Sequence, residues 1–204
     1  AEARAFEHAD PERTVVRPVG DGGDWEVIRK AGTEIRVPRK VSLSRTVGGQ
    51  IPTGFDPKVW GISAEVVNSV DRVALWNMVA TVDAFLSSGF TPAELMRWVH
   101  PSLVANTQGT GIGGLTSMQT MFHGNLLGTP KPNDILQEVL PNVVAAHVMQ
   151  SYVGGYGAMV HPVGACATAA VSVEEGVDKI RLGKADLVVA GGFDDMTSDA
   201  ITGF

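Results

Sequence analysis

The clearest pattern in the chain is a run of apolar residues over positions 69–88 that covers most of a helix's circumference. Asn77, Thr81 and Ser88 leave only a narrow polar stripe, and Gly89 is a typical residue at which a helix ends. A helix with so little polar surface must be covered by other parts of the protein. The pattern therefore predicts a largely buried helix in the main body of the fold.

The rest of the main body alternates between short strands and helices. Residues 91–94 form a capping box with proline at the first helical position, which predicts a second helix that runs to about His100. The predicted elements that follow are strands at 103–107, 158–163 and 186–192, a helix from about 115 to 122, one or two helices over 134–152 that break at Pro141, and a helix over 166–182. Strands that alternate with helices, one of them a continuous apolar run, predict a layered α/β fold.

The N-terminal region has a different character. Residues 1–40 carry short alternating runs, such as 25–28 and 34–37, separated by prolines and by a glycine-rich turn at 20–23. This pattern predicts a small β-hairpin and a linker outside the main core. We therefore expect two parts, residues 1–40 and residues 41–204, the second beginning with an irregular but ordered loop.

The composition excludes some functional classes. The 204 residues are enough for one domain with a proper core, or for part of a larger one. A formal net charge of −6 offers no basic surface for phosphates, which argues against nucleic acid as a partner. The single cysteine cannot form an internal disulfide, and no apolar leader or long apolar span is present. We expect a cytoplasmic protein that does not enter a membrane.

Cys166 stands where the strand predicted over 158–163 turns into the helix predicted over 166–182. The small residues Gly164 and Ala165 allow a sharp turn that exposes one side chain at the start of the helix. Unpaired amide groups and the positive end of the helix dipole favour a thiolate there, so Cys166 is a candidate nucleophile. The alternative is a packed cysteine in a segment that serves as a scaffold and has no catalytic role.

The helix after Cys166 has an apolar face and a charged face. Spacings of three and four residues place five residues on the apolar face: Cys166, Ala170, Val173, Val177 and Ile180. The opposite face carries Glu174, Glu175, Asp178 and Lys179. The pattern predicts that the apolar face is the buried one.

A glycine motif, G-x-G-x-x-G, begins at Gly109 and ends at Gly114, after a predicted strand and before a predicted helix. This is the arrangement of a dinucleotide-binding fingerprint. That fingerprint also needs an acidic residue at the end of a second strand, and the available Asp134 lies in a proline-containing stretch that cannot end a strand. We prefer a tight turn where the backbone packs closely, and a dinucleotide-binding α/β domain remains an alternative.

Three stretches together carry a resemblance to a known family. Residues 162–169 (PVGACATA), 174–180 (EEGVDKI) and 185–195 (ADLVVAGGFDD) resemble the active-site region of β-ketoacyl-acyl-carrier-protein synthases. The form found in microbial multifunctional type I fatty acid synthases is the most similar one. The loop from Gly109 to Gly114 is similar to the family's glycine loop beside the acyl pocket. The resemblance covers about residues 41–204.

The resemblance implies a thiolase-like fold, in which two similar halves pack in five layers, and a homodimer within a larger homo-oligomer. It implies that Cys166 takes an acyl group from the phosphopantetheine thioester of an acyl carrier protein, and that a malonyl thioester then loses carbon dioxide and extends the chain. The Cys166 amide would be one oxyanion donor. The implied substrate-binding residues are Gly111, Gly113, Gly114, Ala165 and Ala167. No cofactor or metal is implied for this segment.

The family's two catalytic histidines, its supporting lysine and a second oxyanion amide belong to the C-terminal half, which we expect as a partner of this chain. None of the five histidines here lies in a matching motif, although His161 is only five residues before Cys166. We therefore interpret the chain as the N-terminal half of a condensing domain, inactive alone. A thiolase would share the fold and the nucleophile, but the sequence around a thiolase cysteine does not match residues 164–168.

Overall fold

The computed structural model describes residues 10–21, 23–33, 47–49, 53–128 and 134–203, together with residues 3, 4, 7, 51 and 130. The chain divides into two compact units. One consists of Ala1–Val47 and Gln119–Asn133, and the other of Gly48–Met118 and Asp134–Phe204. The boundary at 40/41 expected from the sequence stays a prediction.

The first unit contains the predicted β-hairpin. Strands β1 (Thr14–Val19) and β2 (Asp24–Arg29) pair antiparallel, with Thr14 opposite Arg29. Gly20 and Gly23, which lie between the two strands, both have positive φ, as expected for a glycine-rich turn. The partner of β2 is therefore β1, and the run at 34–37 lies outside the described residues.

Three parallel segments form the sheet of the second unit. Strand β3 (Val104–Asn106) pairs with β4 (Leu187–Val189) in parallel. Single parallel bridges join Asn106 to Met159 on the other side of β3 and Gly109 to Gly192 beyond the paired strands. The strand predicted over 158–163 is wrong in its extent, because only Met159 is bridged. Pro162, which has no amide proton, cannot donate to a ladder there.

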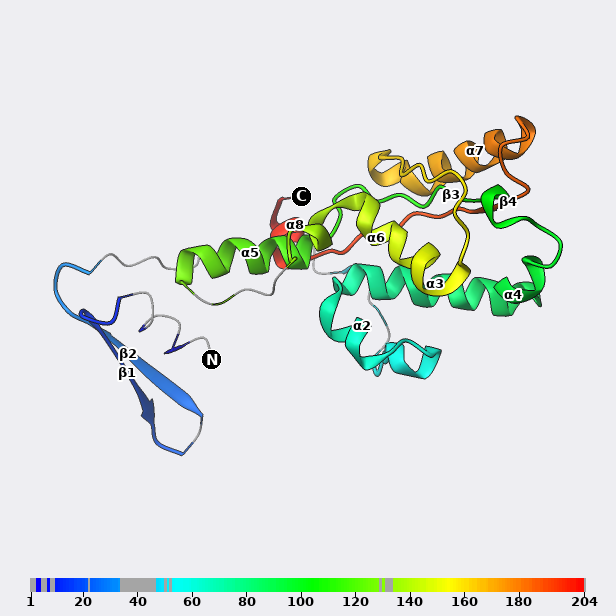
Figure 1. Ribbon diagram of the computed structural model, residues 1–204. Coiled ribbons are helices and arrows are strands. Elements are labelled where there is room, and N and C mark those ends of the chain that lie inside the picture. The colour runs from blue at the N-terminus through cyan, green and yellow to red at the C-terminus, as the bar shows by residue number, and fades with distance from the viewer. Residues whose placement is uncertain are drawn as a thin grey trace. The chain divides into compact units, whose positions relative to one another are not determined.

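Helices cover both faces of this sheet (Figure 1). Alternate residues of the chain that leaves β3 point to opposite sides, as strand geometry requires. Asn106 donates to the Ala145 carbonyl of α6 (Pro141–Val148) at 3.5 Å, whereas Thr107 donates to the Ser172 carbonyl of α7 (Thr168–Arg181) at 2.8 Å. The layered α/β architecture predicted from the sequence is confirmed.

Helix α3 (Arg72–Ser88) is the buried helix that the apolar pattern predicts. It begins three residues later than expected because Asp71 caps it, accepting the Val73 amide proton at 2.9 Å. Asn77 and Thr81, expected as a polar stripe, are 4% and 3% exposed. The stripe is therefore directed into the protein.

The remaining helices are short. The α-helices are α2 (Ala64–Ser69), α4 (Pro92–Leu95), α5 (Leu115–Leu127) and α8 (Ser198–Gly203). The 3₁₀ turns are Pro57–Trp60, Pro101–Leu103, Gln137–Val139 and Ala165–Ala167, and a π-helical turn at Met149–Val153 extends α6. The capping box at Thr91 is present with both of its hydrogen bonds, but α4 is much shorter than the helix expected there. The break expected at Pro141 is confirmed, since Pro141 begins α6.

Candidate active site

Cys166 is exposed and lies in the 3₁₀ turn directly before α7, which itself begins at Thr168. The residue before it, Ala165, has φ = +49°, in the left-handed region that residues with a side chain rarely adopt. That backbone conformation costs about 1–2 kcal/mol, and residues that adopt it are concentrated at functional sites. The sharp turn predicted before Cys166 is thus present, and Ala165 is the residue whose backbone is strained.

The buried side chain of Thr168 forms two hydrogen bonds to this turn. Its hydroxyl, on a residue that is 3% exposed, accepts the Gly164 amide proton at 2.9 Å and donates to the Ala165 carbonyl at 2.8 Å. The two bonds hold the peptide group that follows the strained residue and the one that enters Gly164. The sequence marked Thr168 only as a helical position.

The turn also packs directly on the strand ends. A β-carbon at Gly109 would collide with the Pro162 carbonyl and come within 2.8 Å of the Thr168 methyl group. A β-carbon at Gly192 would lie 2.6 Å from the Ala169 amide nitrogen. Glycine is therefore needed at both positions, since the first turn of α7 rests on the backbone there.

The amide groups at the start of α7 have no side-chain cap. Neither the 3₁₀ turn nor α7 receives a hydrogen bond from the side chain at its N-cap position. The amides of Ala167 and Thr168 donate within the turn, to the carbonyls of Gly164 and Ala165. A helix N-terminus attracts negative charge, and Cys166 stands at this end of α7.

The glycine loop at 109–114 is a closely packed turn, as preferred from the sequence. Gly113 has φ = +82°, and a β-carbon there would collide with the Val139 carbonyl. A β-carbon at Gly114 would collide with the Glu138 carbonyl. These contacts explain the motif without a dinucleotide.

Four of the predicted site residues lie at the Cys166 turn. Ala165, Cys166 and Ala167 form the turn itself, and a β-carbon on Gly111 would lie 3.8 Å from the Ala165 Cα atom. Gly113 and Gly114 pack instead against the backbone of residues 138–139. The roles of all six residues stay predictions.

The Asp194 carboxylate binds the same loop. It accepts hydrogen bonds from the Thr110 hydroxyl at 2.8 Å and from the amides of Gly111 and Ile112 at 3.0 and 3.1 Å. A loop fixed by one carboxylate has a defined position beside the Cys166 turn.

The next residue, Asp195, lies in the core. It is 1% exposed and forms a two-bond ion pair with Arg72, at 2.6 and 2.7 Å. The Thr116 hydroxyl donates to the same carboxylate at 2.8 Å. The hydrogen bond to Asp195 raises the pKa of Arg72 above its ordinary value, although burial opposes it. The sequence analysis included the two aspartates in residues 185–195 but gave neither of them a partner.

The histidines that could be candidates for a base have local partners. His161 Nδ1 is 2.8 Å from the Gln108 carbonyl oxygen, and His147 Nε2 is 3.1 Å from Glu138. Burial raises the pKa of Glu138, but hydrogen bonds from His147 and from the Asp71 amide outweigh it and hold that pKa below its ordinary value. His147 thus helps to hold the Glu138 carboxylate against the start of α3.

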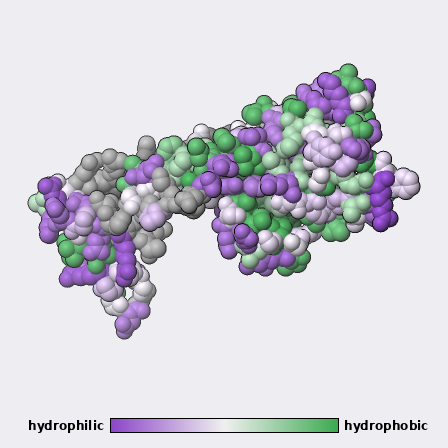
Figure 2. Space-filling model, in the orientation of Figure 1, coloured by the Kyte–Doolittle hydropathy of each residue, from purple (hydrophilic) through white to green (hydrophobic). Residues whose placement is uncertain are grey.

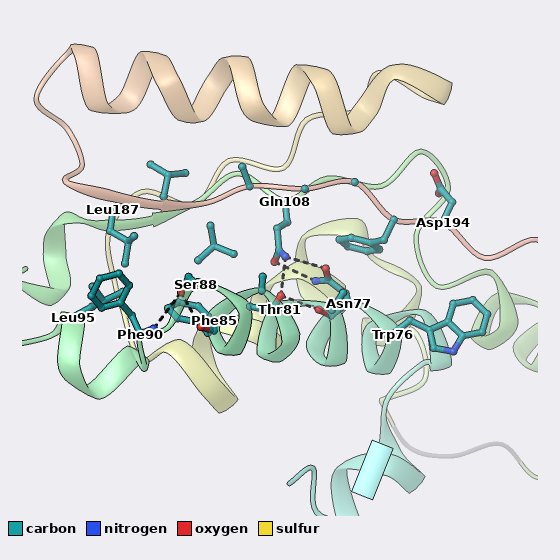
Figure 3. Close-up of a pocket in the computed structure, with 18 of the residues that line it drawn as sticks. Trp76, Asn77, Thr81, Phe85, Ser88, Phe90, Leu95, Gln108, Leu187 and Asp194 are labelled. Carbon is teal, nitrogen blue, oxygen red and sulfur yellow. Dashed lines mark hydrogen bonds between the residues drawn. The ribbon is translucent and has the colours of Figure 1, made fainter. Parts of the chain in front are cut away.

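A groove of about 870 Å³ runs between α3 and the chain from Leu187 to Asp194 (Figure 3). Its wall includes Trp76, Phe85 and Phe193. At its floor, Gln108 bonds to Asn77 at 3.0 Å and to Thr81 at 3.0 Å, which accounts for the buried polar stripe of α3. The groove lies along the face of the sheet opposite α7, and Cys166 is not among the residues that line it.

In the part of the chain that the structure describes, no group of three or more His, Cys, Asp or Glu side chains is arranged to hold a metal ion. None of the described helices combines the length and the apolar character needed to cross a membrane.

Comparisons with known proteins converge on one family. The family model described as "Beta-ketoacyl synthase, N-terminal domain" matches residues 17–204. Fatty acid synthase subunit alpha of Candida parapsilosis is 37% identical over 198 residues, which is 97% of this chain and 10% of the relative. The chain thus spans a small fraction of the length of the curated relatives it matches.

Two solved structures share the fold. The ketosynthase FabY from P. aeruginosa matches with a TM-score of 0.72 and 25% identity, over 95% of this chain and 30% of that one. A type II PKS acyl-carrier protein in complex with its ketosynthase matches with a TM-score of 0.60 and 14% identity, over 74% of this chain and 42% of that one. The thiolase-like fold predicted from the sequence is confirmed by these neighbours.

Proposed function

Because the chain belongs to the β-ketoacyl synthase family, as the N-terminal domain of that enzyme, we propose that Cys166 is its acyl-accepting nucleophile in fatty acid biosynthesis. The observation that carries this proposal is the strained turn at Ala165, which exposes the thiol at the uncapped start of α7. Strain of this kind persists only where surrounding contacts hold it, and here Thr168 supplies them.

The first chemical step is acyl transfer. The Cys166 thiolate attacks the carbonyl carbon of an acyl thioester, and the carbonyl oxygen becomes an oxyanion beside the amides of the turn. The bond to the donor sulfur then breaks, which leaves the acyl group on the Cys166 sulfur and releases the donor thiol. The exposed position of Cys166 allows a thioester to approach it.

The donor is an acyl chain on the phosphopantetheine of an acyl carrier protein. In the second step a malonyl thioester loses carbon dioxide, and its enolate carbon attacks the acyl-cysteine carbonyl. The products are a 3-ketoacyl thioester and the free Cys166 thiol. The relatives are fatty acid synthase subunits, and one neighbour is a ketosynthase with its carrier protein, which supports this choice of substrate.

The decarboxylation needs groups outside this chain. His161 Nδ1 is bonded to the Gln108 carbonyl and His147 Nε2 to Glu138, and neither of these bonds involves Cys166. We propose that the C-terminal half of the same domain supplies the histidines, and that a second copy completes a homodimer. A thiolase, a scaffold segment and a dinucleotide-binding domain are not favoured, since the family and the packed glycine loop argue against each.

The test uses the full-length enzyme that contains this domain. Incubation with an acyl-carrier-protein thioester should attach the acyl chain to Cys166, as peptide mass spectrometry would detect, and iodoacetamide at neutral pH should block it. Cys166→Ser should lower condensation by a factor on the order of 10³ or more, because a hydroxyl is not ionised without a strong base. Acylation of another residue in an active wild-type enzyme, with Cys166 unmodified, would overturn the assignment.

A further inference from the structure

The geometry points to Asp194 as a positioning residue for acyl transfer, one that holds the glycine loop at 109–114 against the Cys166 turn. The inference rests on the proposed function, because it concerns the same site. Asp194 does not contact Cys166 in any recorded bond, so its effect would be transmitted through the loop.

Three donors converge on one oxygen of this carboxylate. Asp194 Oδ1 accepts from the Thr110 hydroxyl and from two consecutive backbone amides, Gly111 and Ile112, all within 3.1 Å. Asp194 Oδ2 lies 3.2 Å from the Gly111 amide and adds little. Hydrogen bonds to an ionised carboxylate are stronger than neutral ones, and here they fix the direction of two peptide groups.

The Thr110 hydroxyl extends this arrangement. While it donates to Asp194, it accepts the Gly113 amide proton at 3.0 Å. Thr110 itself is fully buried. One carboxylate and one hydroxyl thus determine the course of the loop from residue 110 to residue 113.

Asp194 is set in place by the strand that precedes it. The Gly109–Gly192 bridge and the Phe193 amide, which donates to the Gly109 carbonyl at 3.2 Å, join the two chains just before the loop begins. Figure 3 shows Asp194 on this segment, where it is one of the residues that line the groove. The carboxylate is therefore attached to a sheet end that does not move independently of the loop.

Gly111 is the link to the nucleophile. A β-carbon there would lie 3.3 Å from Asp194 Oδ2 and 3.8 Å from the Ala165 Cα atom. Gly111 of the loop is thus adjacent both to the carboxylate and to the strained turn. If the loop moved, the space beside the Cys166 thiol would change with it.

The two adjacent aspartates have different surroundings. Asp195 is buried and paired with Arg72, whose side chain is 49% exposed, and removing either partner would leave the other charge unpaired. Asp194 is exposed, so its replacement leaves no buried charge unpaired. A change at Asp194 is therefore expected to alter the loop more than the stability of the fold.

The experiment compares Asp194→Asn, Asp194→Glu and Asp194→Ala in the full-length enzyme. Asparagine keeps an acceptor oxygen at the Oδ1 position, whereas glutamate keeps the charge but displaces it by one methylene group. We expect acyl transfer from an acyl-carrier-protein thioester to fall about 10- to 100-fold in the Glu and Ala variants and by less than about 10-fold in the Asn variant, which keeps the Oδ1 acceptor but loses its charge. A role that depends on charge alone would reverse the order of Asn and Glu.

Two further measurements separate positioning from folding. Alkylation of Cys166 by iodoacetamide, a small reagent that needs no acyl site, and the thermal unfolding midpoint should both stay near wild type. Asp83→Ala, at an exposed aspartate of α3, is the matched control and should change none of the three readouts.

Each possible result of these experiments either supports the role proposed for Asp194 or overturns it. Wild-type acyl transfer in the Glu and Ala variants would overturn it, and so would a parallel loss of acyl transfer, alkylation and unfolding midpoint. If the Ala variant does not fold, the order of Asn and Glu decides alone. If Cys166 of the wild-type enzyme takes no acyl group, the proposed function fails and the inference fails with it, a result distinguishable from the variant outcomes.

Discussion

At the scale of single residues, reactivity at Cys166 depends on how its neighbours hold the backbone. Ala165 occupies the left-handed region although it has a side chain, and Gly164, which could adopt that conformation freely, does not. The turn is therefore imposed by contacts and not by a local preference. These contacts are the two hydrogen bonds of the Thr168 hydroxyl and the close packing of the first turn of α7 on the backbone at Gly109 and Gly192.

Thr168→Val should weaken the turn, because valine has nearly the same shape but no hydroxyl. It leaves the Gly164 amide without its partner and removes one of the two donors to the Ala165 carbonyl, which should cost about 1–3 kcal/mol of stability. We expect slower Cys166 alkylation in the folded enzyme, followed by mass spectrometry, and a lower midpoint of denaturant unfolding. Thr168→Ser, which keeps the hydroxyl and loses one methyl group, should restore most of the alkylation rate. Equal rates in the Val variant and the wild type would show that the hydroxyl does not hold the turn.

At the scale of elements, the main surprise is the orientation of α7. Its apolar face, expected to be buried, is exposed in this chain: Val173, Val177 and Ile180 are 53%, 39% and 50% exposed. The face that lies on the sheet is a row of small and polar residues, Thr168, Ser172 and Gly176. Figure 2 shows apolar and charged surface side by side along the edge that α7 forms.

The small face of α7 is explained by close approach to the sheet. A β-carbon at Gly176 would lie 3.1 Å from Val188 and 3.3 Å from the Thr107 hydroxyl. Ser172 bonds to the Thr107 carbonyl and to the Gly191 amide, so the helix is tied to both strands. The apolar face is then left for a covering element, and we propose that the C-terminal half of the domain provides it.

Val177→Asp tests this proposal in the full-length enzyme. If the apolar face is covered there, an unpaired carboxylate in the contact should destabilise the domain by about 1–3 kcal/mol or more, measured as a lower midpoint of denaturant unfolding. Glu174→Lys, which also changes charge on an exposed position of α7, is the control and should have a small effect. An unchanged midpoint in the Val177→Asp variant would mean that this face stays in water.

At the scale of the whole molecule, the second unit presents surfaces that a folded enzyme must cover. Beyond the face of α7, the single bridge at Met159 is at one edge of the described sheet, and the groove between α3 and residues 187–194 lies along the face of the sheet opposite α7. Exposed strand edges and apolar surface invite association with other chains. The sequence analysis expected a homodimer within a larger homo-oligomer, and that expectation stays a prediction.

Residues 1–204 produced alone should therefore be poorly soluble or aggregated, as size-exclusion chromatography would measure. The fragment should give no 3-ketoacyl product from acyl- and malonyl-carrier-protein thioesters, because the histidines proposed for decarboxylation lie outside it. The full-length enzyme under the same assay is the positive control. A soluble monomer that forms the product would refute both the half-domain interpretation and the assignment of those histidines.

The features that the sequence alone determined are those carried by local chemistry. The capping box at Thr91, the start of α6 at Pro141, the turn between β1 and β2 and the turn before Cys166 follow from residues within a few positions of each other. Hydrophobic periodicity also predicted that α3 is buried. The motif around Cys166 identified the family, because a nucleophile elbow needs a specific short run of small residues.

Tertiary structure decided which surfaces meet. The Arg72–Asp195 pair joins residues 123 positions apart, and the strain at Ala165 exists only because Thr168 and two distant glycines support it. Periodicity marks an apolar face of α7 but cannot say what covers it, so the burial inferred for that face was wrong for this chain. The physical reason is that periodicity records how residues are distributed around one helix, whereas burial depends on which other segments, near or distant in the chain, supply the opposing atoms.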